Sequence, residues 1–337
     1  MSKNSVPTIG DVARRAGVSI ATVSRVLNGT APVAGETAER VQAAIAGLRY
    51  TPRAAARVLA SRRTNALGLL LPEIGGWFFP SMLRGIELAA REAGYDLLIH
   101  TTEDTHSLRT SRRALGMHNT DGLIVFSNSV EQDELEQFKR RGFPIVLLHQ
   151  SPPESLDIPV VTIENKSGAQ KLVDHLIEVH NCCQIVFLQG PEGHEDSEWR
   201  ERGYRESLEA HNIPFDEALI ASGKFDEAIA ASAISQLLMD GVDFDAVFCG
   251  DDDAALGVMT VLQRAGRVVP DDVAVAGFDD VPLARFLSPP LTTVRAPTEQ
   301  VGADAVRQLV RVIRGERAEP LTLLPTELVI RKSCGCS

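Results

Sequence analysis

DVARRAGVSIATVSRVLNG, residues 11–29, decides the fold of the first part of this chain. Val12 and Ala16 repeat at helical spacing, and Gly17 can adopt the left-handed conformation that ends a helix. Ser19 can then cap a second helix. Two short helices joined around a glycine predict a helix-turn-helix, whose second helix is thin enough to enter the major groove of DNA. An ordinary helical hairpin with a solvated polar face would show the same spacing, so spacing alone leaves both interpretations open.

A third helix is predicted over about residues 37–48, where Val41 and Leu48 fall on one face and would close a small core. The pattern D-V-A-x-x-A-G-V-S-x-x-T-V-S-R-V-L-N resembles the DNA-binding head of the lactose-repressor (LacI/GalR) family, and the likeness continues to residue 63. This resemblance favours a DNA-binding head over an ordinary hairpin.

The charge of the chain is divided unevenly along its length. The formal net charge of the 337 residues is −11. Residues 1–64 hold ten Lys and Arg against three Asp and Glu, which gives +7, and the remainder holds 24 against 42, which gives −18. A basic segment on an acidic body indicates a polyanionic partner for that segment alone. Charge alone fits a membrane surface as well as nucleic acid, and the resemblance favours nucleic acid.

The resemblance implies which side chains of the head meet DNA. Three would read base edges: Ile20, Ala21 and Arg25. An arginine there can donate two hydrogen bonds to guanine, whereas Ile20 and Ala21 offer only apolar contact, for instance to a thymine methyl. Hydroxyl and amide side chains would hold phosphates: Thr8, Ser19, Thr22, Ser24, Asn28 and Thr37. Ala34 stands where a small hydroxyl or acidic residue is common in the family, so one phosphate contact is expected to be missing.

Residues 53–63, RAAARVLASRR, have little apolar surface to bury and follow a proline. A helix of this length is marginal alone in water, so a basic linker is one interpretation. The resemblance implies instead a hinge helix that orders on DNA and inserts Leu59 into the minor groove. Arg53 departs from the asparagine usual at its position.

From residue 66 onward, short apolar runs alternate with helical stretches in two series, such as ALGLLLP before SMLRGIELAAREAG. Near-continuous apolar strands with helices between them indicate parallel sheets covered on both faces. We expect the last helix, 298–314, and strands within 321–331 to cross back, one to each half. The resemblance implies the periplasmic sugar-binding-protein fold for this region.

The predicted fold class is therefore α/β: an N-terminal three-helix helix-turn-helix DNA-binding head and a periplasmic-binding-protein-like core of two doubly wound parallel-sheet subdomains. The expected divisions are a DNA-binding domain over 1–52, a hinge helix or linker over 53–64, and an effector-binding and dimerisation core over 65–337. Within that core, the N-subdomain takes about 65–163 and 296–322, and the C-subdomain about 164–295 and 323–331.

Ligands of open α/β sheets collect at the carboxyl ends of strands, and a shared cleft is expected between two such subdomains. The candidate effector-binding residues lie after predicted strands or at the following helix start: Glu73, Trp77, Phe79, His149, Arg200, Asp251 and Asp279. Carboxylates and a guanidinium suit a polyol, and an aromatic ring can cover an apolar sugar face. Other interpretations are open: Asp252 caps a helix, Asp280 caps a turn, and Trp77 and Phe78 are inter-lobe packing.

Neither a cofactor nor a metal is predicted. The chain has no G-x-G-x-x-G, no G-x-x-x-x-G-K-[ST] and no H-E-x-x-H motif. His175 and His180 are five residues apart, which misses the helical i, i+4 face, and Cys334 and Cys336 alone are too few for a four-ligand zinc site. A frayed tail with two thiols is therefore expected at the C-terminus. The five scattered cysteines indicate free thiols rather than a disulfide framework.

The expected function is a sequence-specific transcriptional regulator, most simply a repressor, whose operator affinity is controlled by a sugar or sugar derivative. No enzymatic activity is expected. The implied partners are a palindromic double-stranded operator, a small-molecule effector and a second copy of the chain, as a dimer or a tetramer, with no membrane. We expect a cytoplasmic, nucleoid-associated bacterial protein. The alternatives are a cytoplasmic sugar-binding protein without a regulatory role, which the DNA-reading head disfavours, and a doubly wound enzyme.

Overall fold

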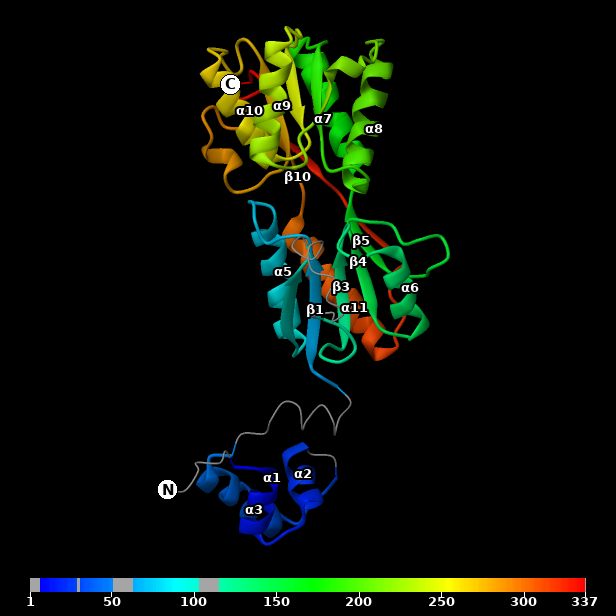
Figure 1. Cartoon of the computed structure of the whole chain (residues 1–337), viewed down its shortest axis with the longest axis vertical. Helices are drawn as coiled ribbons and strands as arrows, with labels where there is room; N and C mark the ends of the chain where they lie inside the picture. The colour runs from blue at the N-terminus through cyan, green and yellow to red at the C-terminus, as the bar shows by residue number, and fades with distance from the viewer. Residues whose placement is uncertain (1–6, 29–30, 51–62, 103–114, 337) are drawn as a thin grey trace. The chain divides into compact units, whose positions relative to one another are not determined.

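The computed structural model describes residues 7–28, 31–50, 63–102 and 115–336 (Figure 1). The chain divides into two compact units, residues 1–64 and residues 65–337, here called the head unit and the two-sheet unit. None of the helices in the described ranges is long and apolar enough to cross a membrane.

The described residues of the head unit form three helices, α1 (Ile9–Ala16), α2 (Ile20–Asn28) and α3 (Gly35–Leu48). Thr8 and Asp11 form a capping box at the start of α1, and Gly17 ends that helix with φ of 69°. The three helices enclose a small core of buried residues: Val12, Ala13, Ala16, Val23, Val41, Ala44 and Tyr50. The predicted helix-turn-helix is therefore confirmed. Helix α3 begins two residues before the predicted start, and Ala34 at its N-cap supplies no side-chain hydrogen bond.

The first sheet of the two-sheet unit has the strand order β11-β5-β4-β3-β1-β2, and every pairing in it is parallel. We call the half that contains this sheet the N-subdomain. Its strands are β1 (Ala66–Leu71), β2 (Asp96–Thr101), β3 (Gly122–Phe126), β4 (Ile145–Leu148), β5 (Val160–Ile163) and β11 (Leu321–Leu324). Its helices in the described ranges are α5 (Phe79–Glu92), α6 (Gln132–Arg140) and α11 (Thr298–Arg314).

The second sheet has the order β12-β10-β9-β8-β6-β7, with only β12 antiparallel to its neighbour, and its half is the C-subdomain. Its strands are β6 (Ile185–Gln189), β7 (Ile220–Ser222), β8 (Ala246–Cys249), β9 (Ala274–Asp279), β10 (Thr292–Arg295) and β12 (Glu327–Val329). Its helices are α7 (Asn165–His180), α8 (Glu195–Ala210), α9 (Glu227–Met239) and α10 (Asp252–Arg264).

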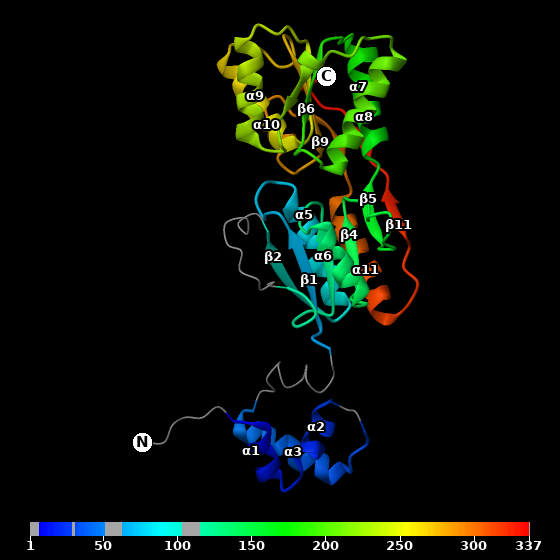
Figure 2. The same ribbon diagram turned by 45° about the vertical axis from the view of Figure 1, so that its right-hand side comes forward.

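The chain passes between the two subdomains three times, from β5 to α7, from β10 to α11 and from β11 to β12 (Figures 1 and 2). The predicted crossing-back of the last helix and of two late strands is therefore confirmed. Strand β11 runs to Leu324, two residues past the boundary expected for the N-subdomain. These three crossings place the carboxyl ends of β1 and β9 at the junction between the subdomains.

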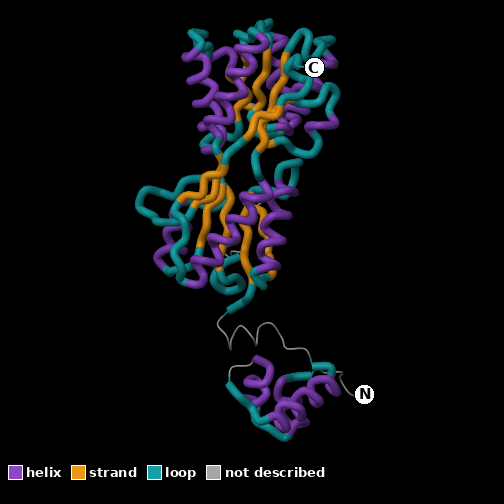
Figure 3. Tube along the Cα trace, turned by 180° about the vertical axis from the view of Figure 1, so that it is seen from behind, coloured by secondary structure: helices purple, strands orange, loops and turns teal. Residues whose placement is uncertain are grey.

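Both sheets are covered on both faces by helices (Figure 3). In the N-subdomain, Leu69 packs with α5 and α11, while Leu70 packs with α6 on the other face. In the C-subdomain, Phe187 packs with α7 and α8, while Val186 packs with α9 and α10. Since every residue of β1 is buried, its uninterrupted apolar run follows from having helices on both sides.

The structure corrects one expectation, adds two elements that were not predicted, and leaves one prediction outside the described residues. The C-terminal tail is not frayed, because Ser333 and Cys334 are buried against the C-subdomain. Strand β7 and helix α9 were not predicted. The sequence pattern also predicts a helix near residues 106–117, and most of it falls within residues 103–114, which lie outside the described part of the chain.

Candidate functional site

Helix α2 presents the side chains expected to read DNA on its exposed side. Val23 is completely buried and fixes the inner side of the helix. Ile20 is 54% exposed, although an isoleucine is normally a core residue, and Ala21 and Arg25 are exposed as well. An exposed apolar side chain and an exposed arginine on the same short helix fit a surface that contacts base edges and methyl groups.

Four of the candidate phosphate-binding side chains lie at or just after helix starts of the head unit: Thr8, Ser19, Thr22 and Thr37. Ser19 accepts a hydrogen bond of 3.1 Å from the Thr22 amide, and the two hydroxyl oxygens are 2.9 Å apart. The Thr8 hydroxyl lies 2.7 Å from an Asp11 carboxylate oxygen, so this side chain already caps α1. Ser24 and Thr37 are half-buried. The side chain of Asn28 and the whole of Leu59 lie outside the described residues, and all these roles remain predictions.

A pocket of about 580 Å³ opens between the two subdomains. Trp77 and Phe78, from the loop between β1 and α5, form an aromatic wall on the N-subdomain side. Asp279 at the end of β9, Arg295 at the end of β10 and Arg331 line the C-subdomain side. A hollow with an aromatic wall, carboxylates and guanidinium groups can hold a polyhydroxylated or carboxylated small molecule.

Arg200 lies behind Asp279, with its side chain only 3% exposed. Its Nε donates to Asn165 Oδ1 at 2.9 Å, one terminal nitrogen donates to the Gly250 carbonyl, and the other to Asp279 Oδ1 at 3.3 Å. The guanidinium carbon is 3.8 Å from the centroid of the Phe278 ring. The arginine therefore orients Asp279 from inside the protein and does not line the pocket.

His149, from the end of β4, joins this network from the N-subdomain. Its Nδ1 is 2.7 Å from Asp196 Oδ2, and Asn165 Nδ2 donates to the other Asp196 oxygen at 2.7 Å. His149 Nε2 is buried without a hydrogen-bond partner, and the rings of Phe78 and Phe126 surround it. Further contacts across the junction run from the Ser151 hydroxyl to Glu195 at 2.7 Å and from the Trp77 amide to Asp253 at 3.0 Å.

Burial and neighbouring charges shift the pKa values of two carboxyl groups of this network, those of Asp279 and Asp196, in opposite directions. Burial raises the pKa of Asp279 to about 6, even though Arg200 lowers it. Burial also opposes the ionisation of Asp196, but His149, through its charge and hydrogen bond, and Arg200 together lower the pKa of Asp196 to about 2. Perturbed carboxyl groups beside a pocket are typical of binding sites.

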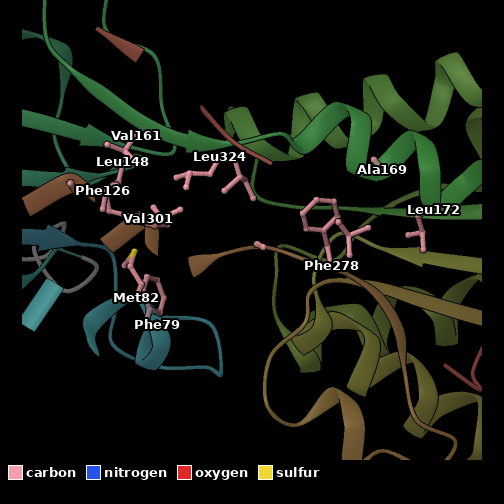
Figure 4. Packing of buried hydrophobic residues seen from close by; sticks show 14 of the residues in the cluster. Phe79, Met82, Phe126, Leu148, Val161, Ala169, Leu172, Phe278, Val301 and Leu324 are labelled. Carbon is pink, nitrogen blue, oxygen red and sulfur yellow. The ribbon is translucent and has the colours of Figure 1, made fainter. Parts of the chain in front are cut away.

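The structure places the other candidate effector residues in different surroundings. Glu73 and Trp77 are exposed on the loop after β1. Phe79 is only 8% exposed and packs into the hydrophobic core beside Met82, as Figure 4 shows, so it does not line the pocket. Helix α5 begins at Phe79, which turns this ring inward and leaves the preceding Phe78 on the pocket side.

Three aspartates that follow β8 and β9 make hydrogen bonds or ion pairs within the protein. Asp251 caps α10 by accepting from the Ala254 amide at 2.9 Å. Asp252, which the sequence offered as the cap, instead accepts from the Thr293 hydroxyl at 2.6 Å and the Val281 amide at 2.8 Å. Asp280 pairs with two arginines of the pocket rather than capping a turn. An effector contact by Asp251 therefore remains a prediction, since one of its oxygens is already engaged.

Sequence reasoning missed several residues of the site: Asn165, Asp196, Arg295 and Arg331. For two of them, the position in the sequence relative to predicted elements could have indicated a role in the site. Asn165 comes two residues after the end of β5, where the chain first crosses between subdomains, and Asp196 lies one helical turn before Arg200 on α8. The tertiary pairing of Arg295 and Arg331 with Asp280 could not be predicted from spacing.

We expect ionisation of Asp279 to cost stability as the pH rises through about 6. Its folded-state pKa lies above the ordinary value of 3.8, so between these two values the folded carboxyl keeps its proton while the unfolded one loses it. Between pH 4 and pH 7 the wild type should therefore lose about 2 kcal/mol relative to Asp279→Asn. Urea unfolding at both pH values measures this, with Asp271→Asn at an exposed position as the control. Parallel pH profiles for the wild type and Asp279→Asn would contradict this expectation.

The chain is similar to known proteins over nearly its whole length. A model of bacterial regulatory proteins of the lacI family matches residues 8–53, and a periplasmic binding protein-like domain model matches residues 173–334. The ribose operon repressor of Halalkalibacterium halodurans is 34% identical over 97% of this chain and 96% of its own length.

Two solved structures show the same arrangement of secondary structure. A complex of the transcriptional regulator CelR with cellobiose is 33% identical, with a TM-score of 0.73 and coverage of 97% of this chain and 99% of that one. The lac repressor dimer bound to operator and the anti-inducer ONPF is 25% identical, with a TM-score of 0.82 and coverage of 98% and 99%. These matches favour the regulator over a sugar-binding protein without a regulatory role.

Proposed function

Since the chain belongs to the lacI family of bacterial regulatory proteins, we propose that it is a repressor that releases its operator when a sugar or sugar derivative binds between its subdomains. It is a DNA-binding transcriptional regulator and not an enzyme. The observation that carries the proposal is the pairing of an exposed DNA-reading helix with a polar pocket at the junction of two subdomains. Such a protein would work in the bacterial cytoplasm, on nucleoid DNA.

In this proposal, α2 enters the major groove and Arg25 donates to a guanine, while Ile20 and Ala21 contact base methyl groups. The hydroxyl groups at the helix starts, with Ser19 as the best placed, would hold phosphates and set the register. Leu59 would wedge into the minor groove as part of a hinge helix, as the resemblance implies.

One head offers few base contacts, so we propose that two copies of the chain bind a palindromic operator together. The lac repressor in the matched structure is a dimer on its operator, which supports a homodimer here. A tetramer would need a further contact between dimers.

The pocket between the subdomains would hold the effector. Asp279 would accept hydrogen bonds from adjacent hydroxyls, and Trp77 or Phe78 would cover an apolar ring face. Arg295 and Arg331 would also suit a carboxylate or phosphate on the effector. The regulator CelR forms a complex with cellobiose, which supports a sugar as the class of ligand.

The contacts across the junction explain how a ligand could be sensed. His149 to Asp196, Ser151 to Glu195 and the Trp77 amide to Asp253 each join one subdomain to the other. A ligand beside them would bind one arrangement of the subdomains more tightly than another, and that difference in affinity is what shifts the equilibrium. A coupling of about 1–3 kcal/mol is enough to control DNA binding.

Selection from a pool of random duplexes with the full chain tests the proposed DNA readout. We expect enrichment of one twofold-symmetric sequence, in which each half-site contains a guanine that depends on Arg25. Enrichment of no sequence, or of asymmetric sequences only, would contradict the proposal.

A further inference from the structure

Four metal-ligating side chains meet where the C-terminal tail lies against the end of α7. They are His175, His180, Cys334 and Cys336, and one ligand atom from each lies within 4.8 Å of all the others. The tail and the helix are more than 150 residues apart in sequence. The two imidazole Nε2 atoms are 3.3 Å apart. Cys336 Sγ is 3.4 Å from His180 Nε2 and 3.6 Å from His175 Nε2, and Cys334 Sγ is 3.6 Å from His175 Nε2.

The four separations given above match edges of a zinc tetrahedron. With Zn–N bonds of about 2.0–2.1 Å and Zn–S bonds of about 2.3 Å, a tetrahedral ion holds two nitrogens about 3.3–3.4 Å apart and each nitrogen about 3.6 Å from each sulfur. The three N–S distances and the N–N distance given above all lie within about 0.2 Å of these values. Four of the six edges of the cluster therefore have the lengths that a bound zinc ion requires.

The local structure brings the four groups together in spite of their sequence spacing. Five residues turn a helix through about 140°, so His175 and His180 do not share a helical face. His180 is the last residue of α7, however, and its ring meets that of His175 edge to face, with centroids 5.0 Å apart. Gly335, with φ of 107°, lets the two cysteines turn toward the same point, and a Cβ there would lie 3.1 Å from His180 Nδ1.

The C-terminal tail is held firmly beside the cluster. Ser333 Oγ accepts from the Thr292 amide at 2.8 Å and donates to the Val275 carbonyl at 2.5 Å. The Thr292 hydroxyl also donates to Cys334 Sγ at 3.1 Å. A hydrogen bond donated to a ligating sulfur is the kind of outer contact that orients metal ligands.

We propose that His175, His180, Cys334 and Cys336 bind a structural Zn²⁺ ion with tetrahedral geometry. Two imidazoles and two thiolates are a donor set that structural zinc sites commonly use. Four protein ligands close the coordination shell, so the site is structural and not catalytic. The ion fastens the C-terminal tail to α7, the helix whose first residue, Asn165, contacts both Arg200 and Asp196.

The test uses the full chain, purified under reducing conditions, treated with a chelator and titrated with Zn²⁺. We expect one zinc per chain in the wild type, and affinity at least about 100-fold weaker in Cys336→Ser and in His180→Ala. Cys183→Ser is the matched control, because Cys183 is exposed and outside the cluster, and this variant should keep the ion. Zinc should raise the thermal midpoint of the wild type and of Cys183→Ser but not that of Cys336→Ser.

Titration with Co²⁺ provides a second measurement that does not depend on stability. A tetrahedral site with two thiolates gives intense visible absorption and a near-ultraviolet sulfur-to-cobalt band, whereas an octahedral aqueous ion gives neither. The proposal is wrong if the reduced wild type binds no zinc, if bound cobalt lacks these bands, or if Cys183→Ser loses the ion as fully as Cys336→Ser.

Discussion

Replacing Arg25 by alanine is expected to weaken binding to the preferred duplex by about 10- to 100-fold while hardly changing binding to random duplex. The guanidinium is exposed on α2, and a bidentate pair with guanine contributes about 1–3 kcal/mol of discrimination. Loss of the Arg25 guanidinium should remove the preference for one base pair in each half-site. Fluorescence anisotropy with the selected duplex and with single-base variants of it, at fixed salt, measures both effects.

Arg14→Ala is the matched control for Arg25→Ala. Arg14 is also an exposed arginine of the head unit, but it lies on α1, paired with Asp11 at 3.2 Å. Removing its charge should lower affinity for all duplexes by a similar small factor. If Arg14→Ala and Arg25→Ala change the base preference equally, α2 does not read the sequence as proposed.

Replacing Arg200 by alanine is expected to destabilise the two-sheet unit by about 3–5 kcal/mol. The variant would leave the carboxylates of Asp196 and Asp279 buried without the guanidinium that lies between them. The loss should be smaller at pH 5 than at pH 8, because protonated carboxyl groups need no opposite charge. Urea unfolding at both pH values measures the loss and its pH dependence.

Two further variants serve as comparisons for Arg200→Ala. Arg202→Ala, at an exposed position on the same helix, should change stability by no more than about 0.5 kcal/mol. Adding Asp279→Asn to Arg200→Ala should recover part of the lost free energy of unfolding, since one of the two buried, unpaired carboxylates is removed. The account would be contradicted if Arg200→Ala and Arg202→Ala lowered the free energy of unfolding equally. It would also be contradicted if the effects of Arg200→Ala and Asp279→Asn were strictly additive, because Arg200 would then not stabilise the buried carboxylates.

Local chemistry explains why much of the fold could be predicted from the sequence. The bounds of α1 follow from the Thr8 cap and the Gly17 stop, and α11 covers the predicted residues 298–314. Strand β7 and helix α9 were missed for physical reasons. The strand is three residues long and half exposed, and the helix, EAIAASAISQLLM, has only a weak apolar stripe. Neither shows the periodicity on which such predictions depend.

The candidate site was predictable in its location and only partly in its residues. The ends of predicted strands indicated that Asp279 and the loop before α5 belong to the site. Which of the adjacent Phe78 and Phe79 lines the pocket, however, depends on the residue at which α5 begins. Whether an aspartate faces a ligand or supports the fold depends on tertiary hydrogen bonds, as for Asp252, which holds Thr293. The His175 cluster was unpredictable because it requires the folded position of the C-terminal tail.

The most direct test of the account is to measure DNA affinity of the full-length protein with and without a sugar that binds it. Sugars including cellobiose and ribose would first be screened by thermal shift. The affinity for the selected duplex would then be measured with each stabilising sugar at constant salt. We predict at least a fivefold loss of operator affinity, from a coupling of about 1 kcal/mol or more. An operator affinity unchanged by every sugar that binds would contradict the account.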